Sequence, residues 1–281
     1  MATHASHICL LQHFVVYSGL NLLERVEQQL RQRELMGVGW LDELCFVLTL
    51  NATATMQVVP TISLATSETR GRAAIVDEIK SACLEHGFFL VKDYSEILPP
   101  SLPERTLDAA RCFFAMPEPT KRACFKKDHI WGGYEPFKAL NLDPSNEKGH
   151  GLNEGFSVAP PYHSTAWPEE SALPGFQDTL HEYHAAVTEL AKHICSLIAE
   201  GLDLDAGYFE PFFERQLAHV KLAHYYRPKD QENEEGLFGV APHSDWGAIT
   251  ILLQDQIGGL EILESRTGQW IPVSRTREAR I

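Results

Sequence analysis

A histidine and an aspartate stand two residues apart at the start of an apolar segment, as His243 and Asp245. In an extended chain, side chains at positions i and i+2 point to the same face, so this imidazole and this carboxylate can bind one metal ion. Fe(II) accepts both ligand types, and a second imidazole would complete a three-ligand set that leaves three coordination positions open. No histidine follows His243 in the 281 residues. The sequence therefore predicts two ligands of an iron site and leaves the third unassigned.

The same two residues have a simpler interpretation, because His-X-Asp tripeptides arise often by chance. In that interpretation His243 is a loop residue whose side chain is satisfied locally, and Asp245 is a turn former. The neighbouring sequence favours the metal interpretation, since the pair lies within a series of motifs.

Five motifs follow one another between Lys221 and Val273: LAHYYRP at 222–228, HSDWG at 243–247, LLQD at 252–255, GGLEI at 258–262 and GQWIPV at 268–273. In order and spacing they resemble the first half of the catalytic jelly roll of the iron- and 2-oxoglutarate-dependent dioxygenases, in the isopenicillin N synthase-like branch. Upstream segments are similar to the amino-terminal region of that branch: VPTISL at 59–64, ACLEHGFFLV at 82–91, FFAMP at 113–117 and GLNEGF at 151–156.

This resemblance implies an enzyme that uses O2 to oxidise a small organic molecule, by hydroxylation, desaturation or ring closure of the kind found in secondary metabolism. It implies Fe(II) held by His243 and Asp245, and 2-oxoglutarate as the co-substrate. The family has a co-substrate-binding tyrosine on the strand before the His-X-Asp motif, and Tyr226 is at the matching position. The alternative for Tyr226 is a core aromatic residue with a satisfied hydroxyl. His224, on the same strand, is a further candidate for the third ligand.

Two features of the family are missing from these residues. They are the second histidine and the Arg-X-Ser element, whose arginine binds the far carboxylate of 2-oxoglutarate. The resemblance therefore implies a truncated and impaired oxygenase. Two alternatives stay open: a non-catalytic remnant that acts as a binding or regulatory module, and an iron oxidase that works without 2-oxoglutarate.

The expected fold is α+β, a partial double-stranded β-helix (jelly roll) with an N-terminal helical and mixed region packed outside it. The chain divides into an unmatched extension at 1–55, an N-terminal dioxygenase region at 56–170, linking helices at 171–215 and the incomplete jelly roll at 216–281. An amphipathic helix is predicted at 21–36, within the extension. We expect the extension to make few contacts with the core, because no family motif requires it.

Hydrophobic periodicity predicts the elements that position the motifs. Apolar residues recur with helical period at 72–86, 102–115 and 180–198, and they alternate as in strands at 220–226 and 249–253. Gly87 and Gly201 stand where the first and last of these helices should end.

Composition limits the class of protein further. The formal charge of −14 disfavours nucleic acid and anionic membranes as partners, because both would repel the surface. The six cysteines show no C-x-x-C pair, which argues against a zinc site or a disulfide framework and favours a reduced compartment. The chain start lacks the features of a signal or transit peptide, so we expect a cytoplasmic protein. The oligomeric state is not predicted.

Overall fold

The computed structural model describes residues 7–15, 46–49, 59–67, 70–125, 132–137, 151–160, 162–213, 217–226, 239–243, 245, 249–264 and 268–273. The strands in these ranges are β1 (His7–Val15), β2 (Phe46–Thr49), β3 (Thr61–Ser63), β4 (Phe88–Lys92), β5 (Gly133–Glu135), β6 (Asn153–Val158), β7 (Leu217–Tyr225), β8 (Ile249–Gln254), β9 (Leu260–Glu264) and β10 (Gln269–Val273). The helices are α2 (Arg72–Glu85), α3 (Leu102–Phe114), α4 (Glu118–Ala123), a 3-10 turn at Tyr162–Ser164, α5 (Phe176–Gly201) and α6 (Glu210–Phe213).

Eight of the described strands form one mixed sheet, in the order β3-β4-β2-β8-β1-β7-β6-β5, and β9 and β10 form a separate antiparallel hairpin. The α+β class expected from the sequence is confirmed. The second sheet of a jelly roll stays a prediction, since the described strands beyond the large sheet are those of the hairpin alone.

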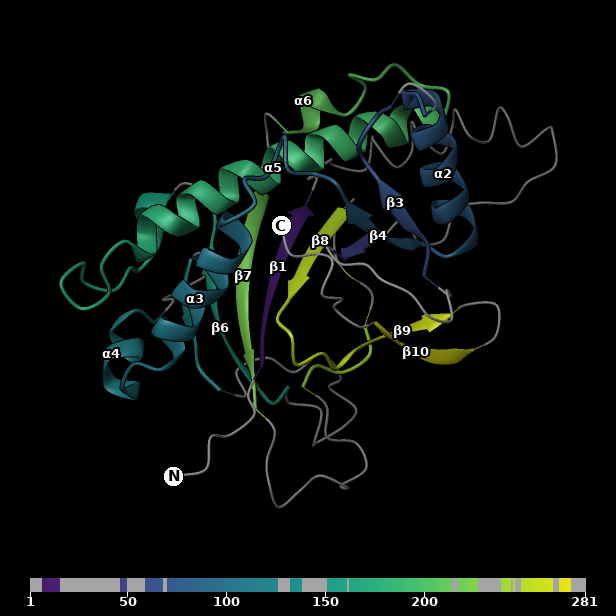
Figure 1. The fold of residues 1–281 in the computed structure, drawn as a ribbon. Helices are drawn as coiled ribbons and strands as arrows, with labels where there is room; N and C mark the ends of the chain where they lie inside the picture. The colour runs from purple at the N-terminus through teal and green to yellow at the C-terminus, as the bar shows by residue number, and fades with distance from the viewer. Residues whose placement is uncertain are drawn as a thin grey trace.

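The helices lie together against the sheet, with α5 the longest (Figure 1). Helices α2 and α3 pack against α5, which also contacts β7 and β8. The three helices expected at 72–86, 102–115 and 180–198 are confirmed as α2, α3 and the greater part of α5. Gly87 has a φ of 76°, the left-handed conformation that favours glycine directly after a helix. No helix among the described residues is both long and apolar enough to cross a membrane.

Strand β7 has two faces with different neighbours, because successive side chains of a strand alternate. Val220 and Leu222 belong to the main buried cluster, together with Val187 and Leu190 of α5. We call this side of the sheet the helix face. Lys221 and the other alternating residues of β7 point to the opposite side of the sheet, which we call the hairpin face.

The hairpin contacts the sheet through the end of β8. Ile251 and Leu253 of β8 belong to the main cluster on the helix face, so Gln254 points to the other side. Its amide donates a hydrogen bond to the carbonyl of Val273 in β10, at 2.9 Å. Gln254 is fully buried and Val273 nearly so. The large sheet is therefore covered on both faces at this point.

The N-terminal extension takes part in the large sheet, which corrects the expectation that it makes few contacts. Strand β1 lies between β7 and β8 and pairs antiparallel with both, in registers that run from His7 opposite Tyr225 and from Cys9 opposite Gln254. Strand β2 lies between β8 and β4 and is parallel to both. Sequence reasoning missed this role because no family motif covers these residues. The helix predicted at 21–36 lies outside the described residues.

We predict that a proline at the centre of β1 destabilises the protein. Gln12 is opposite Val220 on one side and Ile251 on the other, so proline removes an N–H from an interior strand and leaves a buried acceptor unpaired. The expected cost is about 1–3 kcal/mol, which corresponds to a fall of roughly 2–12 °C in the thermal midpoint of a chain of this size.

The control is Gln12→Ala, which keeps the backbone N–H of the same residue. Thermal unfolding followed by circular dichroism compares the two variants. Equal midpoints for Gln12→Pro and the unaltered chain would show that β1 does not pair within the sheet.

Candidate functional site

His243 and Asp245 lie side by side, as their spacing predicts. His243 Nε2 is 3.1 Å from Asp245 Oδ1. The other ring nitrogen, Nδ1, donates a hydrogen bond to the carbonyl of Ala241 at 2.8 Å, which fixes the ring orientation and leaves Nε2 directed at the carboxylate. We call these two residues the metal pair. Two ligands at right angles, each about 2.1 Å from an octahedral ion, lie about 3.0 Å apart, so the observed separation fits two neighbouring coordination positions.

The electrostatics of the metal pair favour a bound cation. The hydrogen bond to Asp245 raises the pKa of His243, and the Ala241 carbonyl adds to this effect, while burial of the ring opposes it. The Asp245 side chain is only 8% exposed, so little water screens its charge. A metal ion bound between Nε2 and Oδ1 would compete with a proton for this position, because only neutral imidazole is a ligand.

The third ligand is not found among the described residues. No group of three His, Cys, Asp or Glu side chains in these ranges is arranged to hold a metal ion. His224, the candidate from the sequence, lies elsewhere: its Nδ1 is 2.9 Å from a carboxylate oxygen of Glu154. One imidazole and one carboxylate thus fit Fe(II) in type and in separation.

Two residues on the hairpin face of β7 have contacts that the structure defines. Lys221 Nζ donates to Glu135 Oε2 at 2.7 Å, and its positive charge acts to lower the pKa of His243. The ring of Tyr225, two pleats along the strand, packs against Gly239, where an added Cβ would be 2.7 Å from Tyr225 Cδ1. Gly239 begins the short described segment that ends at His243. The strand therefore presents Tyr225 to the segment that leads to the metal pair, whereas the Lys221 ammonium is paired with Glu135.

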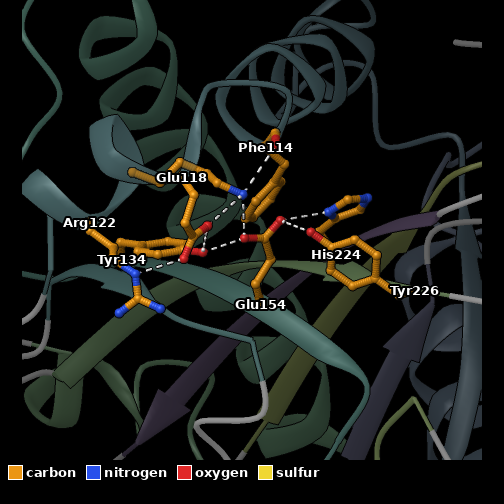
Figure 2. Close-up of polar contacts among 8 residues, drawn as sticks. Phe114, Glu118, Arg122, Tyr134, Glu154, His224 and Tyr226 are labelled. Carbon is orange, nitrogen blue, oxygen red and sulfur yellow. Dashed lines mark hydrogen bonds and ion pairs between the residues drawn. The ribbon is translucent and has the colours of Figure 1, made fainter.

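Tyr226 is turned to the helix face instead, into a network around Glu154 (Figure 2). Oε1 of Glu154 accepts hydrogen bonds from Tyr226 Oη at 2.5 Å and His224 Nδ1 at 2.9 Å. Oε2 accepts from Lys121 Nζ at 2.6 Å and Tyr134 Oη at 2.5 Å. Four donors from α4, β5 and the end of β7 therefore bind one carboxylate of β6.

Burial and hydrogen bonding act on Glu154 in opposite directions. The residue is 1% exposed, and burial alone would raise its pKa. Hydrogen bonds from His224, Lys121, Tyr134 and Tyr226 outweigh this effect and lower the pKa of Glu154 to about 2. Burial, and then the bond to Glu154, raise the pKa of both tyrosine hydroxyls. The carboxylate is thus ionised and the tyrosines are donors at neutral pH.

Sequence reasoning gave Glu154 no role. The signal for it was one acidic residue in a strand that carries no other charge, and the structure shows all six residues of β6 to be buried. A charge in such a strand requires partners, but its donors are up to 72 positions away, so the sequence could not identify them.

A cavity of about 530 Å³ lies beside this network, with Phe114, His224, Asp255 and Ile257 in its lining. The ring of Phe114 stacks on His224, with centroids 5.1 Å apart. Neither residue of the metal pair lines the cavity. The cavity and the metal pair are therefore separate features of the described structure.

Comparison with known proteins gives consistent results for sequence and fold. Residues 59–173 match a family described as "non-haem dioxygenase in morphine synthesis N-terminal", and residues 218–281 match the "2OG-Fe(II) oxygenase superfamily". A 2-oxoglutarate-Fe(II) type oxidoreductase of Emericella nidulans is 33% identical over 219 residues, which are 72% of this chain and 61% of the relative. A 2-oxoglutarate-dependent dioxygenase of Aspergillus niger is 30% identical over 239 residues, which are 79% of this chain and 71% of the relative.

Among solved structures, full-length Neurospora crassa T7H in complex with alpha-KG superposes with a TM-score of 0.64 and 24% identity. The match covers 79% of this chain and 72% of that one. This similarity concerns the fold. The chain spans less than two thirds of the Emericella relative, 61% of its length.

We predict that the Glu154 carboxylate makes the free energy of unfolding depend on pH in the acidic range. Its pKa is about 2 in the folded protein against a usual value of 4.5, so the unfolded chain binds the proton more tightly. The stabilisation is complete above pH 4.5 and is lost as the pH falls toward 2. It amounts to about 3 kcal/mol at 1.36 kcal/mol per pKa unit. Urea unfolding across this pH range measures it.

Two variants isolate this effect from general acid unfolding. Glu154→Gln should flatten the dependence between pH 4.5 and 2. Glu118→Gln is the matched control, because the Glu118 carboxylate also contacts Lys121 but is 48% exposed, so solvent screens it; this variant should keep the unaltered chain's slope. The same slope in all three proteins would contradict the prediction.

Proposed function

Because the chain belongs to the 2-oxoglutarate and Fe(II)-dependent oxygenase superfamily, we propose that it acts in the oxidation of a small organic molecule by O2. Fe(II) and 2-oxoglutarate are the cofactor and co-substrate of this superfamily, as the sequence resemblance implied. The observation that supports the proposal is the 3.1 Å separation of His243 Nε2 and Asp245 Oδ1. The proposed oxidation covers three outcomes: hydroxylation, desaturation and ring closure.

In this proposal each residue of the metal pair has a defined task. His243 supplies neutral imidazole nitrogen, held in one orientation by the Ala241 carbonyl. Asp245 supplies a largely buried negative charge, which favours a divalent cation over neutral solvent. Bound Fe(II) would supply the site for O2 and for the keto acid group of 2-oxoglutarate.

Two adjacent tyrosines are candidates for binding the co-substrate. The family resemblance indicates Tyr226, whose hydroxyl is bound to Glu154 on the helix face. The geometry favours Tyr225, which lies on the hairpin face of β7 and packs against the segment that leads to His243. We therefore propose Tyr225 as the residue that contacts 2-oxoglutarate, and retain Tyr226 as the alternative.

Replacing each tyrosine by phenylalanine tests this assignment. Tyr225→Phe should raise the Kd of 2-oxoglutarate about tenfold, the loss expected for one hydrogen bond of about 1.4 kcal/mol. It should change the thermal midpoint less than Tyr226→Phe, which removes a donor from a buried carboxylate. Calorimetric titration of the Mn(II)-loaded chain measures the affinity. An unchanged Kd in Tyr225→Phe beside a raised Kd in Tyr226→Phe would favour Tyr226.

A second candidate function is a non-catalytic binding or regulatory module with the same fold. Such a module would require no third ligand beyond the two side chains of the metal pair, which lie 3.1 Å apart. In this case the metal pair could still bind a divalent ion weakly, without turnover.

We predict that residues 1–281 alone form no succinate above background with Fe(II), O2 and 2-oxoglutarate. Losing one partner of a metal site typically costs 10- to 100-fold in affinity or activity, and here a direct ligand and the arginine for the co-substrate are both missing. Appending a strand that carries a second histidine and Arg-X-Ser should restore succinate formation. Robust turnover by residues 1–281 that is lost in His243→Ala would point to an unrecognised third ligand.

Metal binding itself is a separate prediction for the same chain. His243→Ala should weaken Mn(II) binding at least tenfold, because one of two protein ligands is removed. The control is His193→Ala on α5, a histidine outside the site, which should leave the Kd unchanged. Electron paramagnetic resonance of free Mn(II) gives both values. Equal Kd values for the two variants would exclude the metal pair as the binding site.

A further inference from the structure

Glu154 is held between two sets of donors with different positions in the fold. On one side, Lys121 and Tyr134 bind Oε2 and connect the carboxylate to α4 and β5. On the other side, His224 and Tyr226 bind Oε1 and connect it to the end of β7 (Figure 2). The two sets share one carboxylate, so each can be weakened without changing the other's residues.

The bonds to His224 and Tyr226 determine how the end of β7 is turned. These residues are two apart, so both point to the helix face, and the residue between them must point to the hairpin face. That residue is Tyr225, whose ring packs against Gly239. Asn153, opposite Tyr225 in the β6 and β7 register, donates to the Gly239 carbonyl at 2.7 Å.

Burial of apolar surface does not choose between the two tyrosines. Tyr225 and Tyr226 are adjacent and have identical side chains, so a slip of one residue at the end of β7 would exchange them at no hydrophobic cost. Such a slip would bring Tyr225 to the place of Tyr226 at Oε1 of Glu154, but it would also bring Ala223 to the place of His224, so Glu154 would lose its imidazole donor. A buried carboxylate strongly resists this loss. The polar contacts therefore select the observed arrangement.

We propose that Glu154 is a positioning residue: through His224 and Tyr226 it holds the Tyr225 ring against Gly239, in the segment that leads to the metal pair. The orientation of Tyr225 is a property of the chain itself. Its consequence for 2-oxoglutarate binding rests on the proposed function.

The experiment places one fluorotyrosine at position 225 and follows it by fluorine NMR without ligand or metal. In the otherwise unaltered chain its resonance should differ from that of the unfolded chain, because the ring packs against Gly239. In Tyr226→Phe, which removes a donor to Oε1, the resonance should move toward the unfolded position or split. In Tyr134→Phe, which removes a donor of the same kind to Oε2, it should stay in place.

Tyr134→Phe is the matched control for a purely structural role. Tyr134 is fully buried, so its loss should lower the thermal midpoint at least as much as Tyr226→Phe does. Glu154→Gln should move the fluorine resonance in the same direction as Tyr226→Phe. If Glu154→Gln fails to fold, the pair of tyrosine variants still decides the question. Equal shifts in both tyrosine variants, or a shift in neither, would overturn the proposal.

A second readout separates this inference from the proposed function. If 2-oxoglutarate binds the Mn(II)-loaded chain, Tyr226→Phe should raise its Kd about tenfold, and Tyr134→Phe by less than about threefold. If the unaltered chain binds no 2-oxoglutarate, or binds it equally well in His243→Ala, the proposed function fails for these residues. The fluorine comparison then still shows whether Glu154 orients Tyr225.

Discussion

The pleat of β7 divides the chemistry of this protein between two faces of one sheet. Lys221 and Tyr225 point to the hairpin face, where they contact Glu135 and Gly239, whereas His224 and Tyr226 point to the helices and to Glu154. Because the period of a strand is two, no local adjustment moves one of these side chains without moving its neighbours. Each of these side chains can therefore lie either on the hairpin face or in the buried network around Glu154. The register of β7 decides which.

Charge burial explains why that register is stable. Glu154 is almost completely removed from water, and a carboxylate in that position is tolerated only with donors around it. Its four donors come from α4, β5 and the end of β7, so the arrangement of these elements is fixed by one charge as well as by apolar packing. A network of this kind can specify one arrangement of the elements that supply its donors. The carboxylate thus defines an orientation that two adjacent tyrosines leave undetermined.

The sheet around the site includes strands that family motifs do not cover. Residues before 59 lie outside the matched regions, yet β1 separates β7 from β8 and β2 separates β8 from β4. In the sequence the metal pair lies between β7 and β8. In the sheet these two strands do not pair with each other, because β1 lies between them. The lateral separation of β7 and β8 therefore depends on the N-terminal strand. Backbone hydrogen bonds make this possible, since an edge accepts any extended segment of compatible length.

The sequence by itself determined the superfamily, the α+β class, three helices and the His243 and Asp245 pair, because all of these depend on local period or on spacing within a few residues. Tertiary structure alone decided the role of Glu154, since its donors lie up to 72 positions away. It also decided what each face of β7 contacts: alternation separates Tyr225 from Tyr226, but only the fold places Tyr226 at Glu154 and Tyr225 against Gly239. The position of β1 was not predictable for a related reason: strand pairing uses backbone groups that every residue has, so composition does not specify the partner.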